Sequence, residues 1–345
     1  MNYTLARNAT AAAVVVCGTL ALLAAIVAVA GYAPGPALEA LWRGSFGSWY
    51  SFTSATLVRA TPLIIVGIAT TLAFRAGVFN IGGEGQLLVG ASLAAFVVLG
   101  VPAGAWSVPL GLGAGAIGGA VWAAIPAVMR HRFGVLEVIT TLMLNAVAIQ
   151  LVGWLVHGPL QEPTHVYPQS ATIASPAQLP IIASGTRMHA GVALALLLAA
   201  GAWWFATQTA AGFRWRAVGA NPHAAAVTGR IDVARTVFIV FVASGALAGL
   251  AGAVEVQGVA LALYESLSPG YGYTAIAVAL LARLDPRAVV PSALLFAALE
   301  AGAGAMQRDA GVPSVLVKIV EAALILVVLA FDARQRRRLA VAVVA

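Results

Sequence analysis

Residues 213–230 read FRWRAVGANPHAAAVTGR and form a basic, polar island between two long apolar blocks. Asn221 is a good N-cap residue, and Pro222 is tolerated at the first position of a helix. The pattern therefore predicts a short helix over residues 223–228, which Gly229 ends. A short helix held between two membrane-spanning segments is well placed to transmit force to another protein. The alternative is an ordinary cytoplasmic turn with a helical kink.

Composition identifies the class of fold. Hydrophobic residues make up 61% of the 345 residues, and charged residues make up only 9%. Many apolar runs approach the roughly 20 residues that a helix needs to cross a hydrocarbon core of about 30 Å. The runs are continuous, whereas the strands of a membrane barrel alternate between polar and apolar residues. The sequence therefore predicts an all-α, polytopic membrane protein with about ten transmembrane helices in a single domain, residues 1–345.

The apolar runs also set the order of the predicted spans. The first is interpreted as a retained helix and not a signal peptide, because it does not end in an obvious cleavage site. Residues 31–56, with Trp and Tyr side chains, are predicted to lie outside at the membrane interface. Residues 157–189 are the predicted external loop, and residues 207–234 form the cytoplasmic loop that contains the island. The predicted spans cover residues 11–30, 57–74, 86–100, 105–128, 135–156, 190–206, 235–254, 273–283, 288–305 and 313–331.

The net charge of +7 is interpreted as a sign of membrane orientation and not of a nucleic-acid partner. If Arg7 is cytoplasmic, most arginines fall inside, as the positive-inside rule requires, and both termini are cytoplasmic. The basic tail 334–338 could bind acidic lipid headgroups, although a simple anchor is the favoured reading. The predicted inside arginines are Arg75, Arg130, Arg132, Arg214, Arg216, Arg230, Arg235, Arg283, Arg287, Arg334, Arg336, Arg337 and Arg338; Arg43, Arg59, Arg187 and Arg308 fall outside.

A second polar stretch lies at residues 74–86 and reads FRAGVFNIGGEGQ. It is too polar and too rich in glycine to continue a helix. Irregular backbone beside a span is tolerated only where protein or water satisfies its amides, so the stretch is predicted to line a cavity or interface. The alternative is a tight hairpin in which Asn80 and Glu84 only cap helix ends. No nucleotide-binding motif occurs in the chain.

Other polar residues fall inside the predicted spans. Glu137, Thr140, Thr141 and Asn145 recur near one helical face, which is predicted to look toward the bundle or a pore. For the two threonines, hydrogen bonding between helices is an equal alternative. Near the C-terminus, Lys318 can pair with Glu321 three residues on, and this pairing is favoured over a proton relay.

Small residues and histidines are interpreted as structural. Glycines at 111, 115 and 119 have the spacing that lets helices pack closely. The histidines at 157, 165 and 189 lack the spacing of metal ligands, so no metal site is predicted. An intramembrane enzyme would need facing catalytic groups, and none occur. An ion-coupled secondary transporter would need a buried acid, for which Glu300 and Glu321 are the candidates.

Three segments together resemble the permease subunits of bacterial ATP-binding-cassette importers. They are residues 74–86, residues 216–225 (RAVGANPHAA) and residues 272–282 (GYTAIAVALLA). The resemblance covers residues 57–330 and is to the branch shared by branched-chain amino acid, ribose and nucleoside systems. Within that branch, Asn80-Ile81-Gly82-Gly83-Glu84-Gly85-Gln86 looks like the nucleoside permeases.

The resemblance implies a multi-pass protein of the bacterial inner membrane that is not an enzyme. It implies a second, related permease chain, two cytoplasmic ATPase subunits that hold ATP and Mg²⁺, and an external binding lipoprotein that delivers the nucleoside; this chain would need no cofactor. Ribose-like sugars or branched-chain amino acids are the alternative cargo. The island would be the coupling helix that docks into the ATPase, with the residues Gly219, Asn221, Pro222, His223, Ala224, Ala225 and Gly229. The path would be bordered by Phe79, Asn80, Glu84, Gln86 and Asn145, with Tyr271 and Tyr273 as further stacking residues.

One departure from the family pattern concerns the end of the island. The family usually continues after the coupling glycine with an apolar residue, whereas here Arg230 intervenes before Ile231. This departure could alter the contact with the ATPase, and it leaves the resemblance intact.

Overall fold

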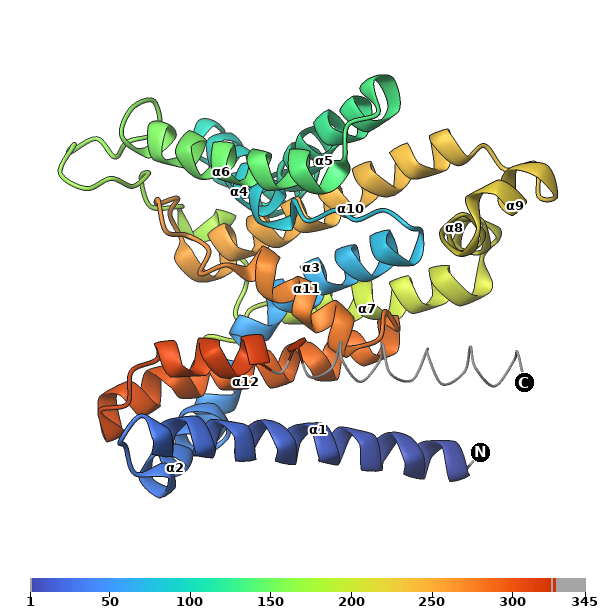
Figure 1. Ribbon diagram of the computed structural model, residues 1–345. Coiled ribbons are helices and arrows are strands. Elements are labelled where there is room, and N and C mark those ends of the chain that lie inside the picture. Colours follow the sequence, from blue (N-terminus) through green and yellow to red (C-terminus); the bar gives the residue numbers. More distant parts are fainter. Residues whose placement is uncertain (1, 324, 327–345) are drawn as a thin grey trace. The chain divides into compact units, whose positions relative to one another are not determined.

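The protein is a helical chain, shown by a computed structural model that describes residues 2–323, 325 and 326, with side chains from residue 15 onward (Figure 1). In the described part, β structure is limited to two isolated bridges, Gln169 with Tyr264 and Ile181 with His189. The helices are α1 (Asn2–Val29), α2 (Pro34–Ser45), η1 (Ser51–Leu57), α3 (Val58–Arg75), α4 (Gly83–Gly100), α5 (Ser107–Phe133), α6 (Glu137–Val156), η2 (Ser175–Ala177), α7 (Gly191–Gln208), α8 (Ala210–Ala220), α9 (Pro222–Val227), α10 (Val233–Glu255), η3 (Val256–Ala260), α11 (Tyr271–Leu281) and α12 (Pro286–Ala310).

Seven of the helical segments in the described part are long and apolar enough to cross a membrane. Two shorter apolar helices, Val15–Val29 and Tyr271–Leu281, accompany them. The polytopic all-α prediction is confirmed, whereas the count of ten and the sides of the termini stay predictions. The tenth predicted span, residues 313–331, lies partly outside the described residues, and the basic tail 334–338 lies wholly outside them.

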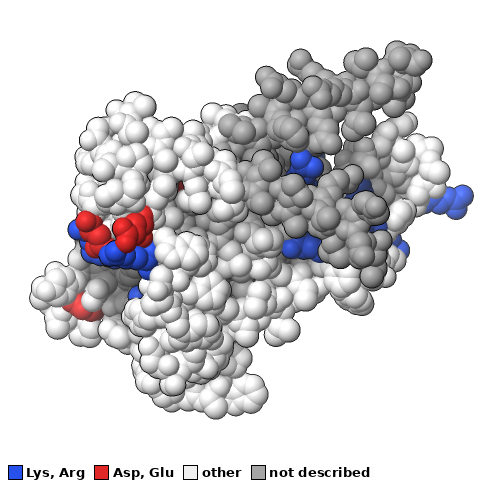
Figure 2. Space-filling view, turned by 90° about the horizontal axis from the view of Figure 1, so that it is seen from below, with Lys and Arg blue, Asp and Glu red and all other residues white. Residues whose placement is uncertain are grey.

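The chain divides into two compact units, residues 1–59 with 294–345 and residues 60–293. Unit 1 contains α1, α2 and most of α12, which share a buried apolar cluster that includes Leu23, Leu41 and Met306. In this unit the Lys318 Nζ lies 2.7 Å from Glu300 Oε1 and 3.1 Å from Glu321 Oε2. The predicted pair is therefore a triad. On the face shown in Figure 2, uncharged residues cover most of the described surface, and charged side chains gather in small groups.

The second predicted span, residues 57–74, starts earlier than predicted. Residues 31–56 were expected to be an external stretch, yet they contain α2 and the π-helix η1, and the apolar crossing run begins at Ser51. The threonine hydroxyls of η1 donate hydrogen bonds to backbone carbonyls: Thr53 Oγ1 donates to Trp49 O at 2.7 Å, and Thr56 Oγ1 donates to Ser45 O at 2.8 Å. Because these polar groups are satisfied internally, the helix can continue through them.

Unit 2 is built around close contacts between α4, α5 and α10. A Cβ on Gly119 of α5 would lie 2.1 Å from the carbonyl oxygen of Gly245 on α10, and one on Gly90 of α4 would lie 2.3 Å from Gly249 Cα. A Cβ on Gly115 would meet the Ala253 Cβ at 2.5 Å. The predicted role of the α5 glycines in close packing is confirmed, because only hydrogen fits between these backbones.

The long loop at residues 157–189 is packed against the segment after α10. Ser170 N–H donates to Leu263 O, Ile173 N–H to Leu261 O, and Leu179 N–H to Gln257 O. His189 ends the loop and is only 1% exposed. Its Nδ1 accepts a hydrogen bond from Gly191 N–H at 3.1 Å, so the ring is neutral with its proton on Nε2. In the described part, no group of three or more His, Cys, Asp or Glu side chains could hold a metal ion.

Burial and the neighbouring Arg187 charge lower the pKa of His189 from 6.5 to about 4. The unfolded chain therefore binds a proton at His189 as the pH falls below 6.5, while the folded chain does not. We expect acidification from pH 7 to pH 5 to cost about 2 kcal/mol of stability through this group. The unfolding temperature of the detergent-solubilised protein, compared at pH 7 and pH 5, measures this loss of stability. His189→Gln should reduce the acid sensitivity and the exposed His157→Gln should not; equal sensitivity of both variants would contradict the assignment.

Candidate translocation site and coupling helix

The starts of α4 and α11 meet inside unit 2. With 11 residues, α11 is about 16 Å long, which is roughly half of a hydrocarbon core. Its Gly272 N–H donates to Glu84 Oε2 at 2.7 Å, and a Cβ on Gly272 would lie 2.1 Å from the Glu84 nitrogen. Because α11 ends at Leu281, just before the basic turn at residues 283–287, its start lies about 16 Å from that turn.

The irregular segment between α3 and α4 is held by an amide pair. Asn80 Oδ1 accepts from Gln86 Nε2 at 2.9 Å and from Gly82 N–H at 3.0 Å. Asn80 Nδ2 donates to Gln86 Oε1 at 3.0 Å and to Ser244 Oγ of α10 at 2.8 Å. The buried Asn80 side chain is therefore fully hydrogen-bonded, as a polar group beside irregular backbone in an apolar bundle requires.

Asn145 of α6 joins this polar network from a third helix. Its Oδ1 accepts from Gly85 N–H at 2.8 Å. Its Nδ2 donates to Ile81 O at 3.0 Å and to the Tyr273 hydroxyl at 3.3 Å. One side chain thus fixes α6 to the starts of both α4 and α11.

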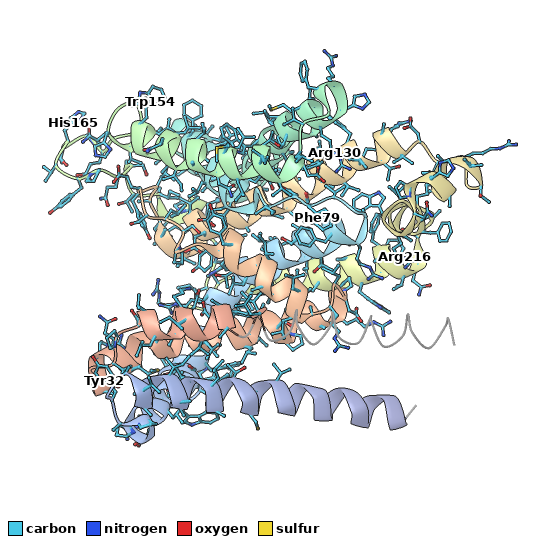
Figure 3. All side chains as sticks on the ribbon, viewed as in Figure 1. Tyr32, Phe79, Arg130, Trp154, His165 and Arg216 are labelled. Atoms are coloured by element: carbon cyan, nitrogen blue, oxygen red, sulfur yellow. The ribbon has the colours of Figure 1, made fainter. Side chains whose placement is uncertain are left out.

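Only two of the seven predicted path residues are accessible. Phe79 is 52% exposed and Tyr273 is 44% exposed. The Phe79 ring also contacts the Phe74 ring, with centroids 5.3 Å apart, and Figure 3 labels Phe79 on the segment between α3 and α4. The other five are at most 5% exposed: Asn80, Glu84, Gln86, Asn145 and Tyr271. In this conformation the buried residues position the backbone, and their contact with a substrate stays a prediction.

The predicted polar face of α6 is largely turned inward. Thr140, Thr141 and Asn145 are buried. Thr141 Oγ1 donates to Glu137 O at 2.6 Å and Thr140 Oγ1 to the same carbonyl at 3.1 Å, so both threonines bond within their own helix. Glu137 pairs with Arg130 at the end of α5, at 2.6 Å. The threonines therefore neither join neighbouring helices nor need a pore to satisfy them.

The short helix of the island forms as predicted at its start. Asn221 Oδ1 accepts the Ala224 N–H at 2.9 Å, and Pro222 occupies the first helical position of α9. At its end, Arg230 and not Gly229 takes the left-handed conformation, with φ at 48°. Ile231 N–H then donates to Ala225 O at 3.1 Å and closes the turn. The residue that departs from the family pattern is thus the one that turns the chain.

The residues predicted to form the coupling helix divide into two groups. Gly219 packs on the end of α3, where a Cβ would lie 2.0 Å from Arg75 O, and Ala225 is buried at 6% exposure. The five others are exposed: Asn221, Pro222, His223, Ala224 and Gly229. Val227, 68% exposed, and Ala226 share the outer surface of α9, although they were not among the predicted residues. Helical periodicity around the buried Ala225 could have indicated them.

Basic residues and the long loop lie toward opposite ends of unit 2. Figure 3 shows Arg130 and Arg216 toward one end and Trp154 and His165 toward the other. A bundle of long apolar helices with an internal polar network and an exposed short helix between two of them fits a membrane transport subunit. The chain belongs to the branched-chain amino acid transport system / permease component family, whose model matches residues 52–329. It is therefore a multi-pass permease of the bacterial inner membrane and not itself an enzyme.

Named relatives cover nearly the whole chain. It is 39% identical to the guanosine ABC transporter permease protein NupP of Bacillus subtilis, over 90% of this chain and 89% of the relative. It is 38% identical to the glucose ABC transporter permease protein TsgB13 of Haloferax volcanii, over 83% and 78%. It is 33% identical to the nucleoside ABC transporter permease protein NupB of Lactococcus lactis, over 88% and 86%. No solved structure matches the chain significantly. A permease of this kind works with ATPase and substrate-binding partners.

Proposed function

We propose that the chain is the transmembrane permease subunit of an ATP-driven importer for nucleosides. The observation that carries this proposal is the similarity, over 90% of the chain, to a guanosine permease. The site supports it chemically. A nucleoside is polar but uncharged and has a flat base, and the accessible groups beside the polar network are the aromatic rings of Phe79 and Tyr273. Such rings offer stacking without a charge that would hold the substrate too tightly.

The proposed partners are those that the family resemblance implies, and the exposed surfaces suggest where they dock. Two cytoplasmic ATPase subunits, which hold ATP and Mg²⁺, dock on the exposed residues of α9. A second, related permease chain completes the path, and an external binding lipoprotein delivers the nucleoside on the side of loop 157–189. ATP binding and hydrolysis then shift the equilibrium between inward-open and outward-open states through differential contacts with α9.

The orientation proposed for the chain has both termini in the cytoplasm. The end of unit 2 with α8, α9 and the basic turns then faces the cytoplasm, in keeping with the excess of arginine there. The loop at residues 157–189 faces outward. Attachment of a membrane-impermeant label to single cysteines at positions 165 and 223 of intact cells tests this orientation, because only position 165 should react.

The function is tested by uptake of labelled nucleosides, glucose, ribose and leucine. Cells express the chain with its partner ATPase, second permease and binding protein, and a second strain carries an inactive ATPase. Nucleoside uptake that disappears in the second strain supports the proposal. Uptake of a sugar or leucine alone would replace the proposed substrate, and uptake that persists without ATPase activity would favour an ion-coupled transporter.

Removal of an accessible ring tests the substrate contact. Tyr273→Ala is expected to raise the KM for nucleoside uptake roughly fivefold or more, because one stacked ring is worth about 1–3 kcal/mol. Tyr273→Phe keeps the ring and loses only the hydroxyl that accepts from Asn145, so it should stay near wild type. The measurement is uptake against nucleoside concentration. A wild-type KM for Tyr273→Ala would exclude stacking on this ring.

A further inference from the structure

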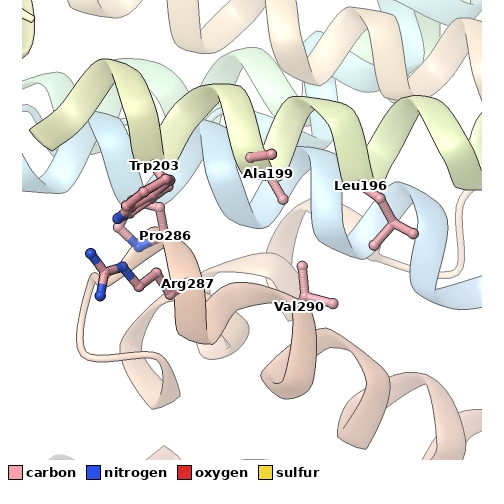
Figure 4. Close-up of a pocket in the computed structure, with 7 residues that line it drawn as sticks. Leu196, Ala199, Trp203, Pro286, Arg287 and Val290 are labelled. Carbon is pink, nitrogen blue, oxygen red and sulfur yellow. The ribbon is translucent and has the colours of Figure 1, made fainter. Parts of the chain in front are cut away.

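A groove on unit 2 lies between α7 and the start of α12 (Figure 4). Its volume is about 400 Å³. The small side chains of Ala199 and Ala200 leave space along α7 between Leu196 and Trp203, so the groove can accommodate an extended apolar chain. The lining residues are Leu196, Ala199, Ala200, Trp203, Pro286, Arg287 and Val290.

One end of the groove carries a positive charge. The Arg287 guanidinium carbon lies 4.7 Å from the centroid of the Trp203 ring, which holds the cation over an aromatic face. Among the described residues, no ion pair within 4 Å involves Arg287. Asp285 accepts the Arg287 backbone N–H at 3.0 Å, so it caps α12. The guanidinium therefore stands at the groove as a donor for an anion.

Neighbouring residues add to the positive charge at this end. Arg216 of α8 donates a hydrogen bond to Ala206 O, three residues beyond Trp203 on α7. Arg283 precedes α12 in the same turn as Arg287. The opposite end of the groove, at Leu196, is apolar and lies in the first half of α7. A ligand that fits must therefore combine an anionic head with an apolar tail.

The surface of α7 beside the groove is suited to lipid. Leu197 is 70% exposed and Trp204 is 58% exposed, and only 33% of the 18-residue apolar stretch of α7 is buried. An exposed Trp at the end of a span is typical of the membrane interface. The charged end of the groove thus lies at headgroup level, while its apolar wall runs toward the hydrocarbon core.

We propose that this groove binds an anionic phospholipid, with its phosphate on Arg287 and one acyl chain along Ala199 and Ala200. Basic pockets between membrane helices on the cytoplasmic side attract anionic headgroups. The charge of the guanidinium selects the headgroup, and the apolar wall holds the tail. The lipid would bridge α7 and α12 next to the end of α8, and so it would support the part of the chain that leads into α9.

The headgroup contact is tested with the full chain in detergent by native mass spectrometry. Phosphatidylglycerol and phosphatidylcholine with identical acyl chains are titrated separately. Wild type should bind phosphatidylglycerol about fivefold more tightly, as expected for one arginine at the membrane surface. Arg287→Gln should lose this preference. Arg132→Gln, which removes an exposed arginine at the end of α5, should keep it. Equal loss in both variants would overturn the proposal, because the preference would then follow total charge.

The acyl-chain contact is tested separately. Ala200→Phe fills the groove and should weaken binding of both lipids, whereas Leu197→Phe on the adjacent exposed surface should not. Unchanged lipid binding by Ala200→Phe would overturn the proposal. A further arm uses Ala200→Cys in the assembled importer. A disulfide or a short cross-link from this position to the second permease would show that protein covers the groove, and this result would overturn the lipid assignment. Absence of a cross-link would support the lipid assignment.

Discussion

Pro222→Glu is expected to lower ATP-driven uptake about tenfold or more while the permease stays folded, since couplings between sites are typically worth 5–150-fold. Pro222 is exposed at the first position of α9, so the new side chain lies on the surface proposed to contact the ATPase. An acidic residue at a helix start is stabilised by the helix dipole, and the Asn221 cap remains. The helix should therefore persist while its docking surface carries a bulky charge. A charged residue at Asn221 should uncouple as well, but it also removes the cap.

The matched control is Ala211→Glu, which places the same side chain on an exposed position in the first turn of α8. Uptake and ATP hydrolysis are measured together in vesicles that contain the complete importer. Pro222→Glu should uncouple the two or release the ATPase on purification, and Ala211→Glu should behave as wild type. Wild-type uptake by Pro222→Glu would show that α9 does not couple.

Gly119→Leu is expected to prevent stable assembly of α4, α5 and α10. A Cβ at this position already lies 2.1 Å from Gly245 O and 2.7 Å from Gly249 Cα, and both obstacles are backbone atoms. Overpacking in a core usually lowers the free energy of unfolding by about 1–3 kcal/mol. Because backbone atoms cannot move aside as a side chain can, we expect the loss for Gly119→Leu to exceed that range. The yield of monodisperse protein after extraction in detergent and its unfolding temperature measure the effect.

Gly113→Leu is the control on the same helix. A Cβ at Gly113 has no atom within 4 Å, and the residue is exposed. The substitution adds the same side chain to α5 and improves its helix propensity equally. Wild-type yield is expected for Gly113→Leu. If the two variants lost equal amounts of folded protein, the close approach at Gly119 would not be what holds the three helices together.

Features that depend on neighbouring residues could be predicted from the sequence. The Asn-Pro start of α9 follows a local rule, and the glycine spacing on α5 follows from one helix period. Most predicted spans end within a few residues of the corresponding helix ends, because these ends also depend on neighbouring residues. The π-helix η1 was missed, because its polar residues resemble an interfacial segment until their hydroxyls are seen to bond to backbone carbonyls.

The connections within the candidate site could not be predicted. Gly85 and Asn145 are 60 residues apart, and Glu84 and Gly272 are 188 residues apart. No periodicity links such positions. The sequence identified polar residues that are expensive in a membrane, but not that their hydrogen bonds are made to the protein. It therefore could not separate the buried Asn80, Gln86 and Asn145 from the exposed Phe79 and Tyr273.

The bond between Glu84 and Gly272 has a consequence for the transport cycle. It joins two helix starts, each with the positive end of its dipole and several N–H groups, through one carboxylate. Pulling them apart would remove the Gly272 N–H from a buried carboxyl group, and a buried polar group that loses its hydrogen bond is costly. The starts of α4 and α11 should therefore travel as one rigid body throughout the cycle. We therefore expect the hinge to lie elsewhere, so that the proposed path opens and closes around this joint and not through it.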